Sequence, residues 1–387
     1  MATTKETVQQ DTLLQQLVTY RRALHEHPEL SMKEYETTAK IKNWLTEADI
    51  TILDYGLEVG VIAEVVGDKP GPTIALRADI DALPIIEQTD LSFASKINGV
   101  MHACGHDFHT ASIIGAALLL QQRKSELKGA VRFIFQPAEE IAEGAKYVEQ
   151  AGALEGVEAI FGMHNKPDLA VGTIGVREGA LMASVDRFKI EINGVGGHAG
   201  IPNNSIDPIV VAGQVITALQ TIVSRNLKAF DNAVISITKV HAGTAWNVIP
   251  EKAVLEGTVR IFQKDVREKV PQRMKEISEG IASSFGATAI FKWYPSVSSV
   301  NNSPLFTAVI AETANDLGLQ VVNAEQSPAG EDFAYYQEKV PGYFVWMGVD
   351  GPQEWHHPSF TLDEEALLVS ANYFSALSVN VLKQLVK

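Results

Sequence analysis

Met101-His102-Ala103-Cys104-Gly105-His106-Asp107-Phe108-His109 stands directly before a run of small and apolar residues, Thr110 to about Gln122, whose spacing predicts a helix. The stretch holds three of the ten histidines of the chain and its only cysteine. Imidazole and thiolate groups gather in this way where a loop leads into a rigid helix and binds a metal ion. A reactive thiol or ordinary core histidines give the same pattern, so the rest of the chain has to decide.

Short apolar runs alternate with helical patterns on both sides of this stretch. The runs predict buried strands at Val61–Val66, Thr73–Ala78, Ala130–Phe135, Ala159–Met163 and Tyr343–Met347. Helices are predicted over about residues 11–27, 142–149 and 305–317 and from about residue 363 onward. A further helix ends at about residue 47, and Ser31 and Glu34 form a capping-box pattern at its start. This alternation predicts an α/β fold with a mostly parallel central sheet covered on both faces.

A different order of elements interrupts this alternation between residues 184 and 298. The predicted order there is strand-helix-strand-strand-helix-strand, which is the ferredoxin-like α+β arrangement. We therefore expect two domains. One is discontinuous and consists of residues 1–183 and 299–387, and the other is an inserted domain of residues 184–298.

Composition narrows the possible partners of the chain. A net charge of −15 without any basic run argues against nucleic acid. No apolar run approaches the roughly 20 residues that span a bilayer, so a membrane partner is not expected. The N-terminus (MATTKETVQQDT) lacks the apolar segment of a signal peptide, which predicts a cytoplasmic protein. One cysteine excludes an intrachain disulfide.

Potential metal ligands follow the predicted strands at their carboxyl ends, where open α/β sheets bind ligands. These are Asp79, Asp81, Glu139, Glu140 and His164, with His356 after a short loop. Cys104 and His106, at the helix entrance, can join them. Such a set of ligands suits zinc, manganese, cobalt or nickel. Because a catalytic zinc ion usually has three protein ligands, the five strongest candidates are better explained by two metal ions that share a bridging group and a water molecule. These five are Cys104, His106, Glu140, His164 and His356.

Other interpretations exist for each residue taken alone. His102 and His109 are more often packing or surface residues than ligands, and a lone cysteine is most often a small buried hydrophobe. A rival mechanism uses Cys104 as nucleophile and a histidine such as His106 as base. That mechanism leaves two carboxylates and several histidines without a role, whereas a joint metal site explains all of them.

A set of spaced motifs resembles the M20 family of metallopeptidases, from about Arg21 to the C-terminus. The nearest subgroup comprises amidohydrolases similar to indole-3-acetyl-amino-acid hydrolases, hippurate hydrolases and N-acyl-amino-acid deacylases. The resemblance implies a zinc-peptidase-like catalytic domain with two metal ions and an inserted lid domain that usually dimerises. The motifs are RADIDALPI from Arg77, HACGHDFH from His102, QPAEE from Gln136, MH at 163–164, GVGGHAGIPNNSIDP from Gly194, NVIP from Asn247, AGEDF from Ala329 and WHHPSF from Trp355.

The resemblance also implies a role for each site residue. The ligands are Cys104, His106, Glu140, His164 and His356, with His357 as the alternative to His356. Glu139, the first glutamate of the pair, matches the general base. Asp79 and Asp81 stand where other branches of the family have a ligand histidine and its orienting aspartate, so we expect them to orient ligands here.

Two residues of the predicted lid match family positions near the substrate. His198 matches a histidine that reaches the active site of a partner subunit, and Asn247 matches a residue close to the substrate. A histidine that stabilises a turn and an asparagine that caps a strand end are the structural alternatives. Many relatives have a second histidine where this chain has Asn203, so no role is assigned to that position.

The function that we expect is metal-dependent hydrolysis of the amide bond of a small, anionic N-acyl amino acid, with an N-acetyl or aromatic acyl group. The products are the free amino acid and a carboxylate, and the protein is expected to be a homodimer through the lid. The alternatives are an amidase with Cys104 as nucleophile and a non-catalytic protein that binds metal or ligand. Glu139 argues against a non-catalytic binding protein, because a binding site does not need a second carboxylate beside a ligand carboxylate.

Overall fold

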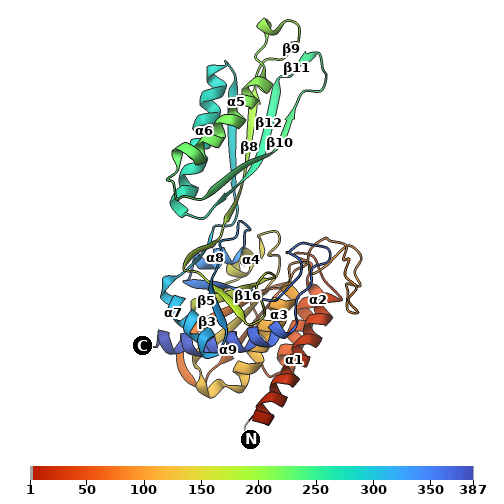
Figure 1. Cartoon of the computed structure of the whole chain (residues 1–387), viewed down its shortest axis with the longest axis vertical. Helices are drawn as coiled ribbons and strands as arrows, with labels where there is room; N and C mark the ends of the chain where they lie inside the picture. Colours follow the sequence, from red (N-terminus) through yellow and green to blue (C-terminus); the bar gives the residue numbers. More distant parts are fainter. Residues whose placement is uncertain (1–2, 387) are drawn as a thin grey trace. The chain divides into compact units, whose positions relative to one another are not determined.

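The computed structural model describes residues 3–386, which divide into two compact units (Figure 1). The first unit consists of the residues up to Gly179, residues 301–325 and the residues from Asp332 onward. The second unit consists of residues 180–300 together with the short segment 326–331. The short strands β7 (Gly179–Met182) and β14 (Val300–Asn302) lie where the chain passes from one unit to the other.

An eight-stranded sheet forms the centre of the first unit, in the order β1-β2-β4-β3-β5-β16-β6-β15. The four middle strands β4, β3, β5 and β16 are parallel to one another, while β2 and β6 are antiparallel to their inner neighbours. The prediction of a mostly parallel sheet is therefore confirmed, with antiparallel strands toward its edges. The strands are β1 (Thr51–Leu53), β2 (Val61–Val66), β3 (Lys69–Asp79), β4 (Lys128–Gln136), β5 (Val157–Lys166), β6 (Thr173–Val176), β15 (Gln320–Asn323) and β16 (Gly342–Gly348).

Helix α3 (His106–Gln122) lies at the centre of the first unit and is buried along almost its whole length. It contacts α1 (Thr3–His25), α9 (Glu365–Leu385) and strand β3. A side chain at Gly115 would come within 2.7 Å of the Ala371 Cβ atom, so the small residues of α3 allow this close packing. The remaining helices of the unit are α2 (Tyr35–Glu47), α4 (Gly144–Gln150), α7 (Thr307–Asp316) and α8 (Phe333–Gln337).

The second unit has the ferredoxin-like order that the sequence predicts. Its antiparallel sheet has the order β10-β12-β8-β13, and buried and partly exposed side chains alternate along β12. Helices α5 and α6 contact each other and this sheet. A separate two-stranded ribbon pairs β9 (Gly197–His198) with β11 (Val248–Ile249). The bounds are β8 (Ser184–Asn193), α5 (Pro208–Thr221), β10 (Ala233–Ala242), β12 (Lys252–Ile261), α6 (Lys264–Ser284) and β13 (Thr288–Pro295).

The capping-box prediction for α2 was wrong. The Ser31 hydroxyl donates to the Asp81 carboxylate at 2.7 Å, and the Glu34 carboxylate accepts from the Ala138 N–H at 2.9 Å. The first N–H groups of α2 are instead satisfied by the Glu29 carboxylate, which accepts from residues 36 and 37. The two side chains of the expected box thus hold loops of the candidate site.

Two helical stretches are long and apolar enough, by length and composition, to cross a membrane: Pro208–Asn226 and Glu365–Leu385. The expectation that no apolar run reaches this length was therefore too strong. Within its own unit, α9 packs against α3 and strands of the large sheet, and α5 packs against α6 and strand β12. Core helices of globular proteins show the same length and composition, and 67% of the apolar stretch of α9 is buried, whereas only 33% of the Pro208–Asn226 stretch is. Burial therefore accounts for the apolar character of α9 more fully than for that of α5.

Candidate metal centre

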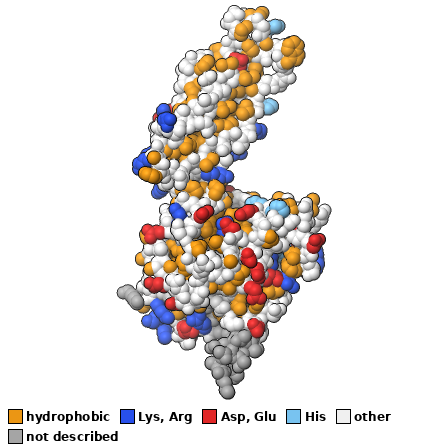
Figure 2. All heavy atoms as spheres, in the orientation of Figure 1, with side chains coloured by type: hydrophobic (Ala, Val, Ile, Leu, Met, Phe, Trp, Pro, Cys, Tyr) orange, Lys and Arg blue, Asp and Glu red, His pale blue; other side chains and the backbone are white. Residues whose placement is uncertain are grey.

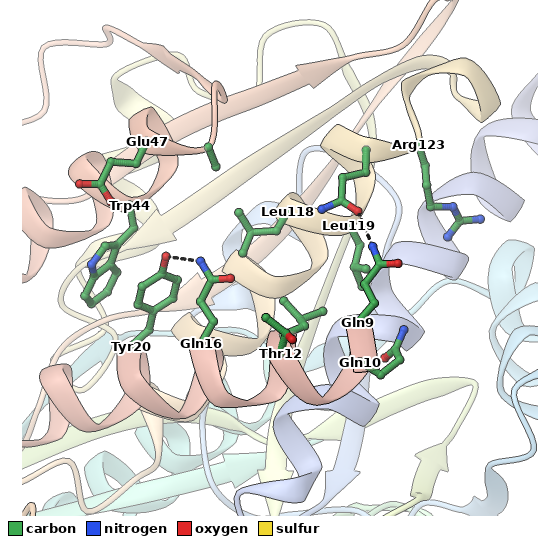
Figure 3. Close-up of a pocket in the computed structure, with 13 residues that line it drawn as sticks. Gln9, Gln10, Thr12, Gln16, Tyr20, Trp44, Glu47, Leu118, Leu119 and Arg123 are labelled. Carbon is green, nitrogen blue, oxygen red and sulfur yellow. Dashed lines mark hydrogen bonds between the residues drawn. The ribbon is translucent and has the colours of Figure 1, made fainter. Parts of the chain in front are cut away.

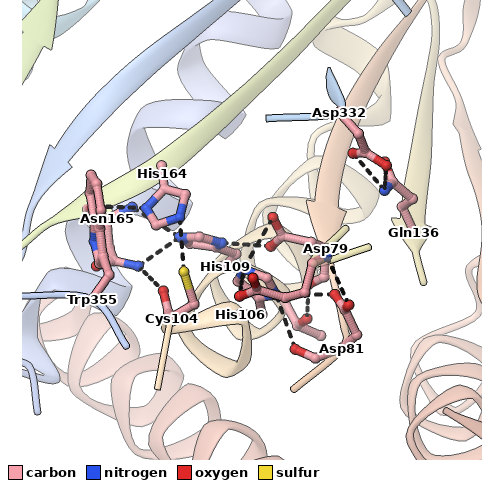
Figure 4. A network of polar contacts seen from close by, with 12 residues as sticks. Asp79, Asp81, Cys104, His106, His109, Gln136, His164, Asn165, Asp332 and Trp355 are labelled. Atoms are coloured by element: carbon pink, nitrogen blue, oxygen red, sulfur yellow. Dashed lines mark hydrogen bonds and ion pairs between the residues drawn. The ribbon is translucent and has the colours of Figure 1, made fainter. Parts of the chain in front are cut away.

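The predicted ligands of the first unit come together at the carboxyl ends of β3, β4 and β5 and at the start of α3. Figure 4 shows three of them, Cys104, His106 and His164. Among the groups of potential ligands whose atoms lie within 4.8 Å of one another, three overlapping ones contain the predicted ligands. All five predicted ligands, together with Glu139, thus belong to one cluster. The groups are Cys104–His106–His164, Cys104–Glu140–His356 and His106–Glu139–Glu140.

His106 is oriented as a metal ligand requires. Its Nδ1 atom lies 3.0 Å from the carbonyl oxygen and 3.2 Å from the Oδ1 atom of Asp81, so Nδ1 carries the proton that is donated to Asp81. Its Nε2 atom is buried and has no hydrogen-bond partner among the described residues. Burial lowers the pKa of His106, but Asp79, Asp81 and Glu140 outweigh burial and raise the pKa to about 10. The same negative charges favour a cation at Nε2.

His164 is also in the ligand form. Its Nδ1–H donates to the Asn165 carbonyl at 2.9 Å, and its Nε2 atom lies 3.4 Å from the Cys104 sulfur atom. Burial, followed by the charge of His109, holds the pKa of His164 well below its ordinary value. The ring is therefore neutral, and its Nε2 lone pair points toward Cys104.

Cys104 is buried among negative groups, which is the wrong environment for an activated nucleophile. Burial, followed by the charges of Glu140, Glu139 and Asp79, raises the pKa of the thiol well above its ordinary value. Catalytic thiols need electropositive surroundings that lower this pKa. A divalent cation in the cluster reverses the local charge and stabilises a thiolate. The geometry therefore favours Cys104 as a ligand over Cys104 as a nucleophile.

His109 lies in the cluster but has no lone pair for a metal ion. Its Nδ1 atom lies 2.6 Å from Asp79 Oδ1, and its Nε2 atom accepts from the Asn165 N–H at 2.9 Å. The sequence led us to expect Asp79 to orient a ligand, but this carboxylate instead orients His109, which is not among the five proposed ligands. His102 is fully buried, and burial lowers its pKa to about 4, which agrees with a packing role for this neutral ring.

Three buried carboxylates fix the loop that carries Glu139 and Glu140. They accept hydrogen bonds from the N–H groups of Ala138 (Glu34, 2.9 Å), Glu140 (Asp81, 3.1 Å) and Ala145 (Asp332, 2.8 Å). Ala138 has a φ of 55°, a left-handed conformation that costs a residue other than glycine roughly 1–2 kcal/mol. The loop is thus held in a conformation that it does not prefer in isolation. Oε1 of Glu140 is buried and has no hydrogen-bond partner among the described residues.

Of the two adjacent histidines near the C-terminus, His356 joins the cluster. Its Nε2 atom lies 3.5 Å from Glu140 Oε1, and its φ of 64° is stabilised by a hydrogen bond from its N–H to the Ala103 carbonyl at 2.8 Å. The Nδ1 atom of His357 instead accepts from the Ser359 N–H within its own turn. The arrangement supports the first choice made from the sequence.

His198 and Asn247 lie in the second unit, next to each other on the β9–β11 ribbon. His198 pairs with Val248, and the Ala199 N–H donates to the Asn247 carbonyl at 3.1 Å. His198 Nδ1 accepts from the Gly200 N–H at 3.0 Å, so in the neutral ring the proton is on Nε2. Both side chains are exposed in this unit, and His198 presents an N–H donor to its surroundings.

Sequence reasoning missed several residues that organise the cluster. The Arg77 guanidinium is fully buried, donates to Asp79 and Asp332 at 2.8 Å each, and contacts Gln136 at 2.9 Å. Arg77, Asp332 and Gln136 all lie within the quoted motifs, so their places in those motifs were an available signal. Asn165 and Trp355 were missed as well, although each is adjacent in sequence to a predicted ligand.

A surface groove of about 850 Å³ lies between α1, α2 and the last turns of α3 (Figure 3). Its walls include the stacked rings of Tyr20 and Trp44 and the side chain of Gln122. His106 is the first residue of α3, and Leu118 is the groove residue of that helix nearest to it, so about 18 Å of helix separates the groove from the ligand cluster. This groove is therefore distinct from the cluster.

An α/β sheet with a cluster of candidate metal ligands at its carboxyl edge, interrupted by a ferredoxin-like insertion, defines the class of protein. The chain belongs to peptidase family M20/M25/M40, whose family model matches residues 75–380. This confirms the resemblance found in the sequence.

Individual relatives cover almost the entire chain. N-acetylcysteine deacetylase of Bacillus subtilis (strain 168) is 66% identical over 368 residues, which cover 95% of this chain and 97% of the relative. A second protein of that strain, named N-acetyl-L-cysteine deacetylase, is 51% identical over 363 residues, covering 94% and 87%. A crystal structure from Bacillus subtilis, described as a dinuclear metal binding peptidase from the M20 family, matches with a TM-score of 0.90 at 61% identity and covers 96% and 99% of the two chains.

Proposed function

We propose that this protein is a metal-dependent deacylase that hydrolyses the amide bond of small N-acylated amino acids. The observation that carries the proposal is the cluster of five potential ligands with Glu139 beside it. A protein that only bound metal would not need Glu139. The products are a free amino acid and the carboxylate of the acyl group.

The relatives indicate the first substrate to test. The two Bacillus subtilis relatives are named as deacetylases of N-acetylcysteine, at 66% and 51% identity. A relative at 38% identity is named N-acetyldiaminopimelate deacetylase, so among these three relatives the amino acid varies while the acetyl group recurs. We therefore take N-acetyl-L-cysteine as the substrate of first choice and N-benzoyl amino acids as the alternative acyl class.

Two divalent cations fit the donors that the first unit offers. The buried Nε2 atom of His106 and the buried Oε1 atom of Glu140 have no hydrogen-bond partner among the described residues, and such atoms are costly unless a ligand satisfies them. In this proposal Cys104, His106, Glu140, His164 and His356 hold the ions, and Asp79 and Asp81 orient the imidazoles. Bound divalent cations supply Lewis-acid activation of a water molecule and of the acyl carbonyl group. Zinc, manganese, cobalt and nickel all suit this set of ligands.

Glu139 is the proposed general base and acid. It accepts a proton from the water molecule whose oxygen bonds to the acyl carbon, and it returns this proton to the amide nitrogen as the carbon–nitrogen bond breaks. His198 is proposed to donate its Nε2–H to the acyl oxygen as negative charge develops there, and Asn247 to bind the substrate near it. Both sit on the ribbon of the second unit, whose surface position suits contacts with a substrate.

We further propose that the protein is a homodimer through the second unit and that His198 serves the site of the partner subunit. Strand β10 is an edge of that unit's sheet, and its Val234 and Val240 side chains are half-exposed. Exposed edge strands with apolar residues readily pair with another chain. The space-filling view shows further hydrophobic side chains on the surface of this unit (Figure 2). A cytoplasmic location is also proposed, because a reducing compartment keeps a ligand thiol available.

Amino-acid release from a panel of substrates tests the proposal. The protein is stripped of metal, dialysed and reloaded with Mn²⁺, Zn²⁺, Co²⁺ or Ni²⁺, and then mixed with N-acetyl and N-benzoyl amino acids, including N-acetyl-L-cysteine. We expect hydrolysis that depends on added metal. No hydrolysis across the panel would contradict the enzyme proposal, and hydrolysis by the fully stripped protein would support Cys104 as the nucleophile.

A further inference from the structure

Asn165 occupies a central place among the ligand-bearing segments. It follows His164 near the end of β5, and its side chain is completely buried. Its Nδ2 group donates to the Cys104 carbonyl at 2.6 Å and contacts His109 Nε2 at 3.0 Å, while its Oδ1 atom accepts from the Trp355 indole N–H at 3.1 Å (Figure 4). Both polar atoms of this amide group therefore have hydrogen-bond partners.

Each of these bonds leads to a segment that carries a proposed ligand. The Cys104 carbonyl belongs to the turn between Cys104 and His106, and Trp355 directly precedes His356. The Trp355 ring also packs edge-on against the His164 imidazole, with 4.5 Å between the ring centroids. One side chain thus connects three stretches of chain that are 60 or more residues apart.

The backbone of Asn165 strengthens the same connections. Its N–H donates to His109 Nε2 at 2.9 Å, and its carbonyl accepts both the His164 Nδ1–H at 2.9 Å and the Trp355 indole N–H at 3.1 Å. The bond to His164 fixes the tautomer that leaves Nε2 available to a cation. Metal-binding histidines commonly depend on such a bond.

Gly105 shows how closely the Cys104 turn is fitted to Asn165. Its φ is +81°, and a Cβ atom there would lie 2.5 Å from Asn165 Nδ2. Both the conformation and the contact therefore require glycine at this position. The turn that separates Cys104 from His106 thus packs closely against the asparagine side chain.

We propose that Asn165 is a positioning residue that sets the distances between the ligand atoms of Cys104, His164 and His356 before any metal ion binds. The inference rests on the proposed function only in taking those residues as ligands. Without the asparagine amide, the Cys104 turn loses its bond to residue 165 and the Trp355 loop keeps only the bond to the backbone carbonyl, so the ligand atoms are held less precisely. Loss of such a supporting group typically costs about 10–100-fold in metal affinity.

A purely structural role would show itself differently, and Asn302 provides the matched control. Asn302 is also buried in the first unit and also bonds through its side chain to distant segments, donating to the Arg177 and Phe344 carbonyls and accepting from the Phe344 N–H at 2.7–2.9 Å. None of these three contacts involves a proposed ligand. Asn302→Ala should therefore lower stability without changing the metal site.

Metal titrations of Asn165→Ala, Asn302→Ala and the wild type, each stripped of metal, test the proposal. Kd for Zn²⁺ and Co²⁺ is measured by competition with a chelating dye, alongside the melting temperature of the metal-free protein. We expect both variants to melt at lower temperature, and only Asn165→Ala to lose about 10–100-fold in affinity for at least one ion. The sulfur-to-cobalt charge-transfer absorption of Cys104 should weaken in the same variant.

Trp355→Phe keeps the experiment decisive if Asn165→Ala does not fold. It removes the indole N–H that donates to Asn165 and keeps an aromatic ring beside His164, so a smaller but measurable loss of affinity, several-fold, is expected. Wild-type affinity in a folded variant of either kind, or an equal loss in Asn302→Ala, overturns the proposal. A wild-type protein that binds these ions but releases no amino acid would refute the proposed function while leaving the titration valid, and a wild type that binds none would refute both.

Discussion

Glu34→Gln is expected to stabilise the metal-free protein at pH 8 and to change its stability little at pH 5. The Glu34 carboxylate is fully buried; one oxygen accepts the Ala138 N–H, and the other has no hydrogen-bond partner among the described residues. Burial, followed by the charge of Asp81, raises the pKa of Glu34 from 4.5 to about 7. The glutamine amide oxygen can still accept the Ala138 N–H, but glutamine carries no charge.

The direction of this change in stability follows from the linkage between protonation and folding. The folded state holds its proton more tightly than the unfolded state, so stability is lost as the pH rises from about 4.5 to about 7. The difference between these two pKa values corresponds to about 3 kcal/mol at pH 8 and to less than about 1 kcal/mol at pH 5. Glu34→Gln removes this loss and should therefore gain a similar amount at pH 8.

Urea unfolding in the presence of a chelator, followed by tryptophan fluorescence at both pH values, measures this difference. Glu36→Gln is the matched control, because Glu36 is exposed on the same helix α2. An equal change at the two pH values, or a destabilisation by Glu34→Gln at pH 8, would show that burial does not raise the pKa of Glu34 in the way described.

Three further predictions address the chemistry. Glu139→Gln should lower kcat by a factor of about 100 to 10,000 and keep both metal ions, whereas Glu140→Gln should lose metal. Metal analysis and steady-state kinetics distinguish the two variants. The opposite pattern would exchange the roles of Glu139 and Glu140. Cys104→Ser should bind Co²⁺ more weakly and abolish the sulfur-to-cobalt absorption, and an unchanged spectrum would remove Cys104 from the set of ligands. His198→Ala should lower kcat by about 100- to 1,000-fold with unchanged metal content. If His198 acts across a dimer, mixing this variant with Glu139→Gln should restore about a quarter of wild-type activity. A mixture that stays inactive, or a monomer by light scattering, would contradict that arrangement.

The sequence predicted the fold well where the periodicity was strong. The buried strands β2, β4 and β16 lie within one or two residues of their predicted limits, because continuous apolar runs bounded by turn residues have few alternatives. The short strands β6 and β15 toward the far edge of the sheet were missed, because four residues are too few to show a clear alternation of apolar and polar side chains. Segment 326–331 joins the second unit although it lies 26 residues beyond the end of that unit's main segment, a long-range contact that no local pattern encodes.

The candidate site was predictable in its ligand types but not in its supporting bonds. Cys104, His106 and His164 are residue types whose chemistry is visible in the sequence. Asn165 and Glu34 are not, because an asparagine or a glutamate at these positions is equally consistent with a turn or a helix cap. Glu34 in fact misled the capping-box interpretation. Its carboxylate is committed to Ala138, more than 100 residues away, and only the folded chain shows that.

Activity measured as a function of metal bound per chain tests the central claim most directly. Metal-free protein is titrated with Mn²⁺, Zn²⁺ or Co²⁺ while bound metal and amino-acid release from an N-acetyl amino acid are followed in the same samples. We predict no release without metal, and a rate that rises with occupancy and saturates at two ions per chain. Full activity in the metal-free protein, or no activity with two ions bound across the acyl amino acids tested, would contradict the account.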